Sequence, residues 1–147
     1  MASQGELFAA APIVPGFSLV EGAVSAAEEA ELEAHIDAAP LAPFEFGQWR
    51  GKRLTANYGS AYDYQRARPK EAPPLPDWLV ALRGKLAPLF GRDSTAFVQG
   101  LLIRYDPGAG IGWHRDRPQY GEVRADWEHS IAPQDLVRRS ITLRTMR

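Results

Sequence analysis

The hydrophobic pattern of this chain changes once, near residue 95, and this change limits the folds that the chain can adopt. Before it, apolar residues recur mainly at helical spacing, although residues 53–59 predict a strand that runs into a turn, and after it they alternate with polar residues as strands do. Turn residues such as Asp106-Pro107-Gly108 separate the strand-like runs. Helices followed by strands predict an α+β fold with a mainly antiparallel sheet. The predicted strands in this part are 97–105, 111–116, 126–131 and 137–145.

Two helices are predicted in the first part of the chain. Ser25 and Glu28 have the spacing of a capping box, which predicts a helix over residues 25–38. A second helix begins near Pro76, because proline suits the first turn, and is stopped by Pro88 or Gly91. Its apolar face is formed by Trp78, Leu79, Leu82 and Leu86.

The composition excludes several classes of protein. The 147 residues predict one domain, residues 1–147, with a core that needs no disulfide. There is no cysteine, so His, Asp and Glu are the only strong metal ligands left. The sequence has no run of roughly 20 apolar residues and does not begin like a signal peptide. We therefore expect a cytoplasmic protein, without membrane contact and monomeric.

The net charge of −1 conceals an uneven distribution of charge along the chain. Residues 1–49 contain eight acids and no Lys or Arg. Residues 50–147 contain all 17 bases and the other ten acids, which gives this part a net charge of +7. A basic part of this kind is compatible with a polyanionic partner such as nucleic acid, because charge bears on partners rather than on fold.

Two of the three histidines lie in contexts that suit a metal site. His114 and Asp116 are two residues apart in a predicted strand, so their side chains share one face. A second imidazole, for which His129 is the best candidate, completes the set of two His and one carboxylate that holds Fe(II) in non-haem oxygenases. The alternative is a strand pair joined by a salt bridge. The third histidine, His35, suits packing on the first predicted helix.

Near the carboxyl terminus, polar residues occupy four alternate positions: Arg138, Ser140, Thr142 and Arg144. A strand places all four on one face, and Ile141 and Leu143 on the other. Two inward-facing guanidinium groups need an anion between them, because buried charges need partners. A dicarboxylate fits, since Arg binds carboxylates with two hydrogen bonds. An edge strand with solvated arginines is the alternative.

Together these motifs resemble the AlkB-like family of Fe(II)- and 2-oxoglutarate-dependent dioxygenases. The family pattern is His-x-Asp, a later His, and Arg-x-Asn/Ser-x-Thr-x-Arg, and residues 103–114 are similar to the strand and turn that precede its first metal ligand. The resemblance covers residues 97–145 well and the amino-terminal half only generally. It implies a double-stranded β-helix (jelly-roll) core over residues 96–147. Residues 1–95 would form the substrate-recognition part, with helices packed on the sheet.

The resemblance also implies a reaction. His114, Asp116 and His129 would hold Fe(II), with 2-oxoglutarate as cosubstrate and dioxygen as oxidant. Enzymes of this kind hydroxylate a C–H bond while 2-oxoglutarate is decarboxylated to succinate. On an N-methyl group, the product collapses to formaldehyde and the demethylated amine. The implied function is demethylation of alkylated bases in DNA or RNA, as in DNA repair, and the same chemistry on a protein substrate is the alternative.

The family pattern further implies how the cosubstrate is bound. Tyr105 and Arg138 would bind the distal carboxylate of 2-oxoglutarate, and Arg144 would lie near the other carboxylate and near Asp116. Ser140 belongs to the same cosubstrate-binding set. It stands where many members have Asn, and Ile103 stands where some have another Asn, so this chain lacks those amide hydrogen bonds.

Substrate recognition is expected in the amino-terminal half, where aromatic and basic residues are interleaved. Rings that stack on a base and cations that bind phosphates are typical of contacts with flipped or single-stranded nucleotides. Packing of these rings in the core is an equal alternative. The candidates are Trp49, Arg53, Tyr58, Tyr62 and Tyr64.

The predicted metal ligands are too close in sequence for a complete barrel of this type. The four strands that normally separate them need roughly 30 to 45 residues, whereas only residues 117–128 lie between Asp116 and His129. Part of the barrel is therefore expected to be absent near Val123 and Arg124. Either the sequence joins two parts of a longer chain, or the protein is a shortened variant with an incomplete barrel, which would be a metal-binding domain or a pseudoenzyme. A non-catalytic β-barrel module that binds nucleic acid or protein is the alternative function.

Overall fold

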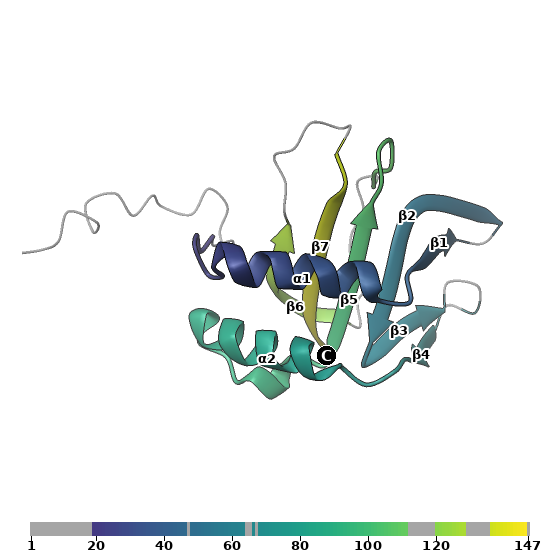
Figure 1. Ribbon diagram of the computed structural model, residues 1–147. Coiled ribbons are helices and arrows are strands. Elements are labelled where there is room, and N and C mark those ends of the chain that lie inside the picture. The colour runs from purple at the N-terminus through teal and green to yellow at the C-terminus, as the bar shows by residue number, and fades with distance from the viewer. Residues whose placement is uncertain are drawn as a thin grey trace, which may run out of the picture.

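The main sheet has five strands in the order β1-β2-β5-β7-β6, and each neighbouring pair is antiparallel (Figure 1). This computed structural model describes residues 19–46, 48–63, 66, 68–111, 120–128 and 136–146. The five strands are β1 (Ala42–Phe46), β2 (Trp49–Tyr58), β5 (Gln99–Tyr105), β6 (Tyr120–Glu128) and β7 (Arg138–Met146). A separate hairpin pairs β3 (Ser60–Asp63) with β4 (Arg68–Glu71).

Both predicted helices are confirmed. The first, α1, is Ala26–Ala38, and the Ser25 side chain accepts a hydrogen bond of 3.1 Å from the backbone N–H of Glu28, as a capping residue should. The second, α2, is Asp77–Leu86. Two 3-10 turns, η2 (Ala87–Phe90) and η3 (Ser94–Ala96), connect it to β5. Among the described residues, no helix combines the length and apolar character needed to cross a bilayer.

The hydrophobic core lies between the two helices and one face of the main sheet (Figure 1). Ile36 of α1 and Leu79 of α2 are fully buried in it, together with residues of three strands. The strand residues are Ala56, Leu102, Ile141 and Leu143. The helices also contact each other: the ring of His35 on α1 stacks on Trp78 of α2, with 4.7 Å between the ring centroids. One face of the sheet is therefore committed to the core, and the opposite face carries the candidate site.

The α+β prediction is confirmed, and two predicted strands, 97–105 and 137–145, correspond to β5 and β7. The strand predicted over 126–131 overlaps β6 at residues 126–128, but β6 begins earlier, at Tyr120, and residues 129–131 lie outside the described part of the chain. The strand predicted over 111–116 lies outside the described residues except for Ile111, which is not in a strand. Val123 and Arg124, where part of a barrel was expected to be absent, are consecutive in β6, and the register with β7 shifts at this point.

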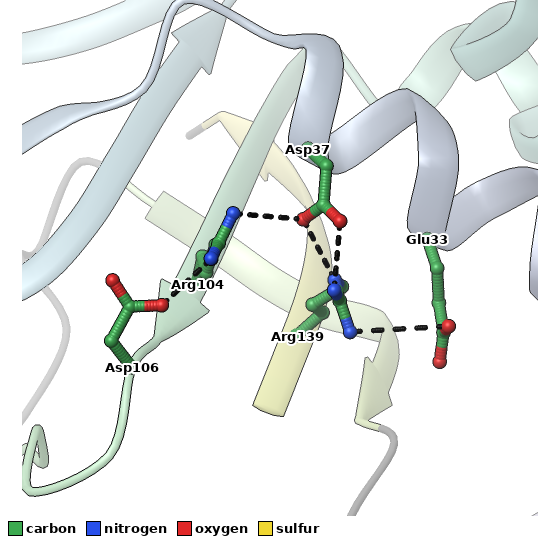
Figure 2. A network of polar contacts seen from close by, with 5 residues as sticks. All are labelled: Glu33, Asp37, Arg104, Asp106 and Arg139. Atoms are coloured by element: carbon green, nitrogen blue, oxygen red, sulfur yellow. Dashed lines mark hydrogen bonds and ion pairs between the residues drawn. The ribbon is translucent and has the colours of Figure 1, made fainter. Parts of the chain in front are cut away.

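An ion-pair network fastens the end of α1 to the sheet (Figure 2). Arg104 and Arg139 lie directly opposite each other on β5 and β7, so their positive charges need an anion nearby. Asp37 of α1 supplies it: Arg139 donates two hydrogen bonds to the carboxylate, of 2.8 and 2.7 Å, and Arg104 approaches it at 3.4 Å. Asp106 and Glu33 complete the network at its two ends.

The same network brings acids of the amino-terminal segment next to bases of the rest of the chain. Acids of the amino-terminal segment pair with bases of the basic part: Asp37 as above, and Glu28 of α1 with Lys85 of α2. Part of the charge separation along the chain is therefore neutralised within the fold. The hydrogen bonds from Arg139 hold the pKa of Asp37 below its ordinary value.

We expect Asp37→Asn to lower the free energy of unfolding by about 1 kcal/mol at neutral pH. The effect is modest because the Asp37 side chain is 37% exposed and water screens its charge. Since folding lowers the pKa of Asp37, its stabilisation is present above the ordinary carboxyl pKa near 4 and is lost as pH falls through the folded-state value. Urea unfolding at several pH values should show the difference from wild type shrinking in acid. Glu31→Gln, at an exposed position of the same helix, is the control, and a difference independent of pH would contradict the prediction.

Candidate functional site

The polar residues of β7 share one face of the sheet, as their alternation predicted. Ile141 and Leu143 point to the other face and belong to the core beneath the helices. Since successive strand residues point to opposite faces, the alternate residues lie on the face away from the helices. These residues, which we call the polar row, are Arg138, Ser140, Thr142 and Arg144.

The polar row combines buried hydroxyl groups with two arginines. Ser140 and Thr142 are 6% and 4% exposed, and the arginines at the two ends are half-buried. On β5, the residues directly opposite the row are Tyr105, Ile103, Leu101 and Gln99. The arginines are six residues apart, or about 20 Å along the strand. A five-carbon dicarboxylate is much shorter. Both arginine side chains would therefore have to extend toward the middle of the row to contact the two ends of one such ligand.

Arg138 and Tyr105 are brought together at one end of the row, as the family resemblance implied. The guanidinium carbon of Arg138 lies 5.1 Å from the centroid of the Tyr105 ring, within the range of a cation–π contact. Arg138 also donates a hydrogen bond of 3.2 Å to the carbonyl of Ala109, in the turn after β5. Gly108 gives that turn its left-handed residue, with φ of 83°. A guanidinium has five N–H donors, so these contacts are compatible with a carboxylate as a further partner.

Arg144, at the other end of the row, is held by two amide side chains that the sequence analysis missed. Its Nη1 donates to Oε1 of Gln99 at 3.2 Å, and Nε2 of Gln99 donates to Oδ1 of Asn57 at 3.0 Å. The three residues lie on the neighbouring strands β7, β5 and β2. The only sequence signal is a glutamine within an otherwise apolar run, residues 97–103.

The chain enters both predicted metal-ligand segments from the same end of the main sheet. β5 ends at Tyr105 and β6 ends at Glu128, and the segments with the predicted ligands follow these strand ends. In the register of the sheet, Tyr105 lies opposite Arg138, and Glu128 lies opposite Ser140. The described backbone thus brings the ends of the two strands that precede these segments to the Arg138 end of the polar row.

The predicted iron ligands themselves, His114, Asp116 and His129, lie outside the described residues. Within the part of the chain that is described, no group of three His, Asp or Glu side chains is arranged to hold a metal ion. The iron site therefore stays a prediction. The described residues do fit the anionic cosubstrate, because they place guanidinium and hydroxyl donors together on one buried face.

The substrate candidates are dispersed rather than gathered in one place. Trp49 is 71% exposed on the hairpin between β1 and β2. Arg53 covers the Phe44 ring at 3.9 Å, and its Nε is buried without a hydrogen-bond partner. Tyr58 packs against the hydrophobic core, which favours the structural alternative for this residue. Tyr62 is in β3, with a side chain that is not described, and Tyr64 lies outside the described residues.

Comparison with known proteins does not assign the chain to a family, so the interpretation of this site depends on the sequence motifs and on the geometry of the polar row. No protein-family model matches the chain, and no curated protein matches its sequence.

Proposed function

We propose that the protein is an Fe(II)- and 2-oxoglutarate-dependent dioxygenase. The observation that carries the proposal is the polar row: two half-buried arginines with two buried hydroxyls between them, on the face of the sheet opposite α1 and α2. Guanidinium and hydroxyl groups are the donors that bind carboxylates, and Arg does so with two hydrogen bonds. The ends of β5 and β6, the strands that precede the two predicted metal-ligand segments, flank this end of β7 and add support.

In this proposal the two ends of the polar row act on the two ends of the cosubstrate. Tyr105 and Arg138 would bind the distal carboxylate of 2-oxoglutarate, with the Ser140 hydroxyl as an added donor, and Arg144 would lie near the other carboxylate. The proposed iron ligands are His114, Asp116 and His129. When bound, Fe(II) and 2-oxoglutarate supply the oxidation of a substrate C–H bond by dioxygen, with formation of succinate and carbon dioxide.

We further propose alkylated nucleic-acid bases as the substrate, and a jelly-roll arrangement in which β5 and β7 belong to one sheet. The exposed ring of Trp49 supports the first, and the exposed bases Arg50 and Lys52 lie on the same hairpin strand, β2, on its other face. The ion pairs of α1 engage Lys85, Arg104 and Arg139, none of which is on this hairpin. The antiparallel pairing of all five strands supports the second.

The proposal predicts turnover that depends on His114. We expect the wild-type protein with Fe(II), ascorbate and 2-oxoglutarate to form succinate, more rapidly when methylated single-stranded DNA is present. His114→Ala should reduce succinate to the amount formed without iron. His35→Ala is the matched control, because His35 stacks on Trp78 between the helices and should leave turnover unchanged.

Mass spectrometry distinguishes the remaining functions. Loss of a methyl group from DNA supports base demethylation, and loss from a methylated peptide alone moves the substrate to protein. No succinate from the wild type, together with binding of single-stranded DNA, would reject the enzyme and favour the non-catalytic binding module.

A further inference from the structure

Gln99 is an uncharged polar residue with no exposed surface, at the start of a strand that is otherwise mostly apolar. Burial of an amide is unfavourable unless its donors and its acceptor find partners. Its carbonyl oxygen accepts from Arg144 at 3.2 Å, and its nitrogen donates to Asn57 at 3.0 Å. The residue thus connects the polar row on β7 to β2, across the strand between them.

The chemistry of the three side chains fixes the direction of this connection. A guanidinium group only donates hydrogen bonds, so Gln99 must turn its oxygen toward Arg144. The Gln99 nitrogen then points away and needs an acceptor, which Oδ1 of Asn57 provides. Without that oxygen, the Asn57 side of the Gln99 amide would no longer favour this orientation, and only the contact with Arg144 would oppose the flipped form.

The arginines at the two ends of the polar row are therefore held differently. Arg138 contacts a carbonyl of the turn after β5 and the ring of Tyr105. Arg144 contacts a fully buried side chain that is itself anchored to a third strand. A neutral partner of this kind orients a guanidinium without neutralising its charge.

We infer that Gln99 and Asn57 are positioning residues that orient the Arg144 guanidinium for the carboxylate nearest to it. This inference rests on the proposed function for its ligand, 2-oxoglutarate. It adds specific roles: Arg144 contacts the anion, and the amide groups of Gln99 and Asn57 hold its guanidinium in position before the anion binds.

The first test separates orientation from charge at Gln99. Gln99→Met keeps the size of the side chain and removes both hydrogen bonds, and Gln99→Glu keeps an acceptor for Arg144 but neutralises its charge. Calorimetry with 2-oxoglutarate and Mn(II), without dioxygen, should show binding about tenfold weaker in each variant. Gln48→Met, in the exposed turn between β1 and β2, is the matched control and should bind as the wild type does.

A second readout follows the Arg144 side chain directly. In NMR spectra, rotation of its guanidinium group should be slow in the wild type and in Gln99→Glu, and fast in Gln99→Met. Asn57→Leu should also accelerate the rotation, and Asn57→Asp, which keeps the acceptor oxygen, should restore the slow rotation. A purely structural role would change stability in these variants but leave the rotation and the affinity as in the wild type.

The two readouts keep the inference and the proposed function apart. Unchanged affinity and unchanged rotation in Gln99→Met would overturn the inference while the dioxygenase proposal stands. A wild type that binds no 2-oxoglutarate would overturn the proposed function, and the rotation of Arg144 would then decide alone whether the amide pair orients it. Circular dichroism and thermal unfolding test whether each variant is folded. If Gln99→Met does not fold, the comparison of Gln99→Glu and Asn57→Asp with the wild type decides the question.

Discussion

Arg138→Ala is expected to weaken the binding of 2-oxoglutarate by about 100-fold, because two charge-assisted hydrogen bonds to one carboxylate are lost together. The side chain is half-buried beside Tyr105 and is held by the Ala109 carbonyl, so its position is defined before a ligand binds. Stability should change little, since Arg138 belongs to the polar row and not to the core. Calorimetry with Mn(II) in place of Fe(II) measures the affinity without turnover.

The neighbouring residue provides the matched control. Arg139 has the same side chain one position further along β7, but it faces α1 and binds Asp37. Arg139→Ala should therefore lower the free energy of unfolding and leave the affinity for 2-oxoglutarate unchanged. Equal affinities in the two variants would contradict the assignment of the polar row as the cosubstrate site.

Gly59→Ala is expected to lower the free energy of unfolding by about 3 kcal/mol or more. Gly59 has a φ of 80°, a conformation that alanine adopts only with strain, and a Cβ atom here would collide with the carbonyl oxygen of Val98. Its N–H also donates to the carbonyl of Pro73 at 2.6 Å. The residue joins β2 to β3, so the strain cannot be relieved without moving one of these strands.

Gly84→Ala is the control for this prediction, because the same substitution falls within α2, where a Cβ atom meets nothing within 4 Å. Alanine is the better helix former, so the free energy of unfolding of this variant should rise by about 0.5 to 1 kcal/mol. Urea unfolding of both variants measures the two opposite shifts. A Gly59→Ala protein as stable as the wild type would reject the described turn between β2 and β3.

The elements predicted correctly from the sequence are those defined by local chemistry. Ser25 marks the start of α1 because its side chain caps a backbone N–H three residues away. The alternation in β7 identified both the core residues and the polar row, since a strand allows only two faces. Tyr105 and Arg138, which the family pattern named together, are opposite each other in the sheet.

The features that the sequence analysis missed depend on contacts between distant parts of the chain. Asn57 and Gln99 become partners only when β2 and β5 pair, and no local pattern signals this. The hairpin of β3 and β4 was hidden by Pro69, because proline has no backbone N–H and a strand tolerates it only where the pairing needs no donor. The neutralising contacts of α1 with Lys85 and Arg139 were hidden because composition records charges without their positions.

The position of β7 also bears on how the protein folds during synthesis. β7 lies between β5 and β6 and supplies two fully buried residues of the core, Ile141 and Leu143. A ribosome-bound chain that ends before Arg138 would present the edge of β5 and an incomplete core to other molecules. Such edges and apolar surfaces promote aggregation. The sheet and its core can therefore be completed only when β7 is available to pair with β5 and β6.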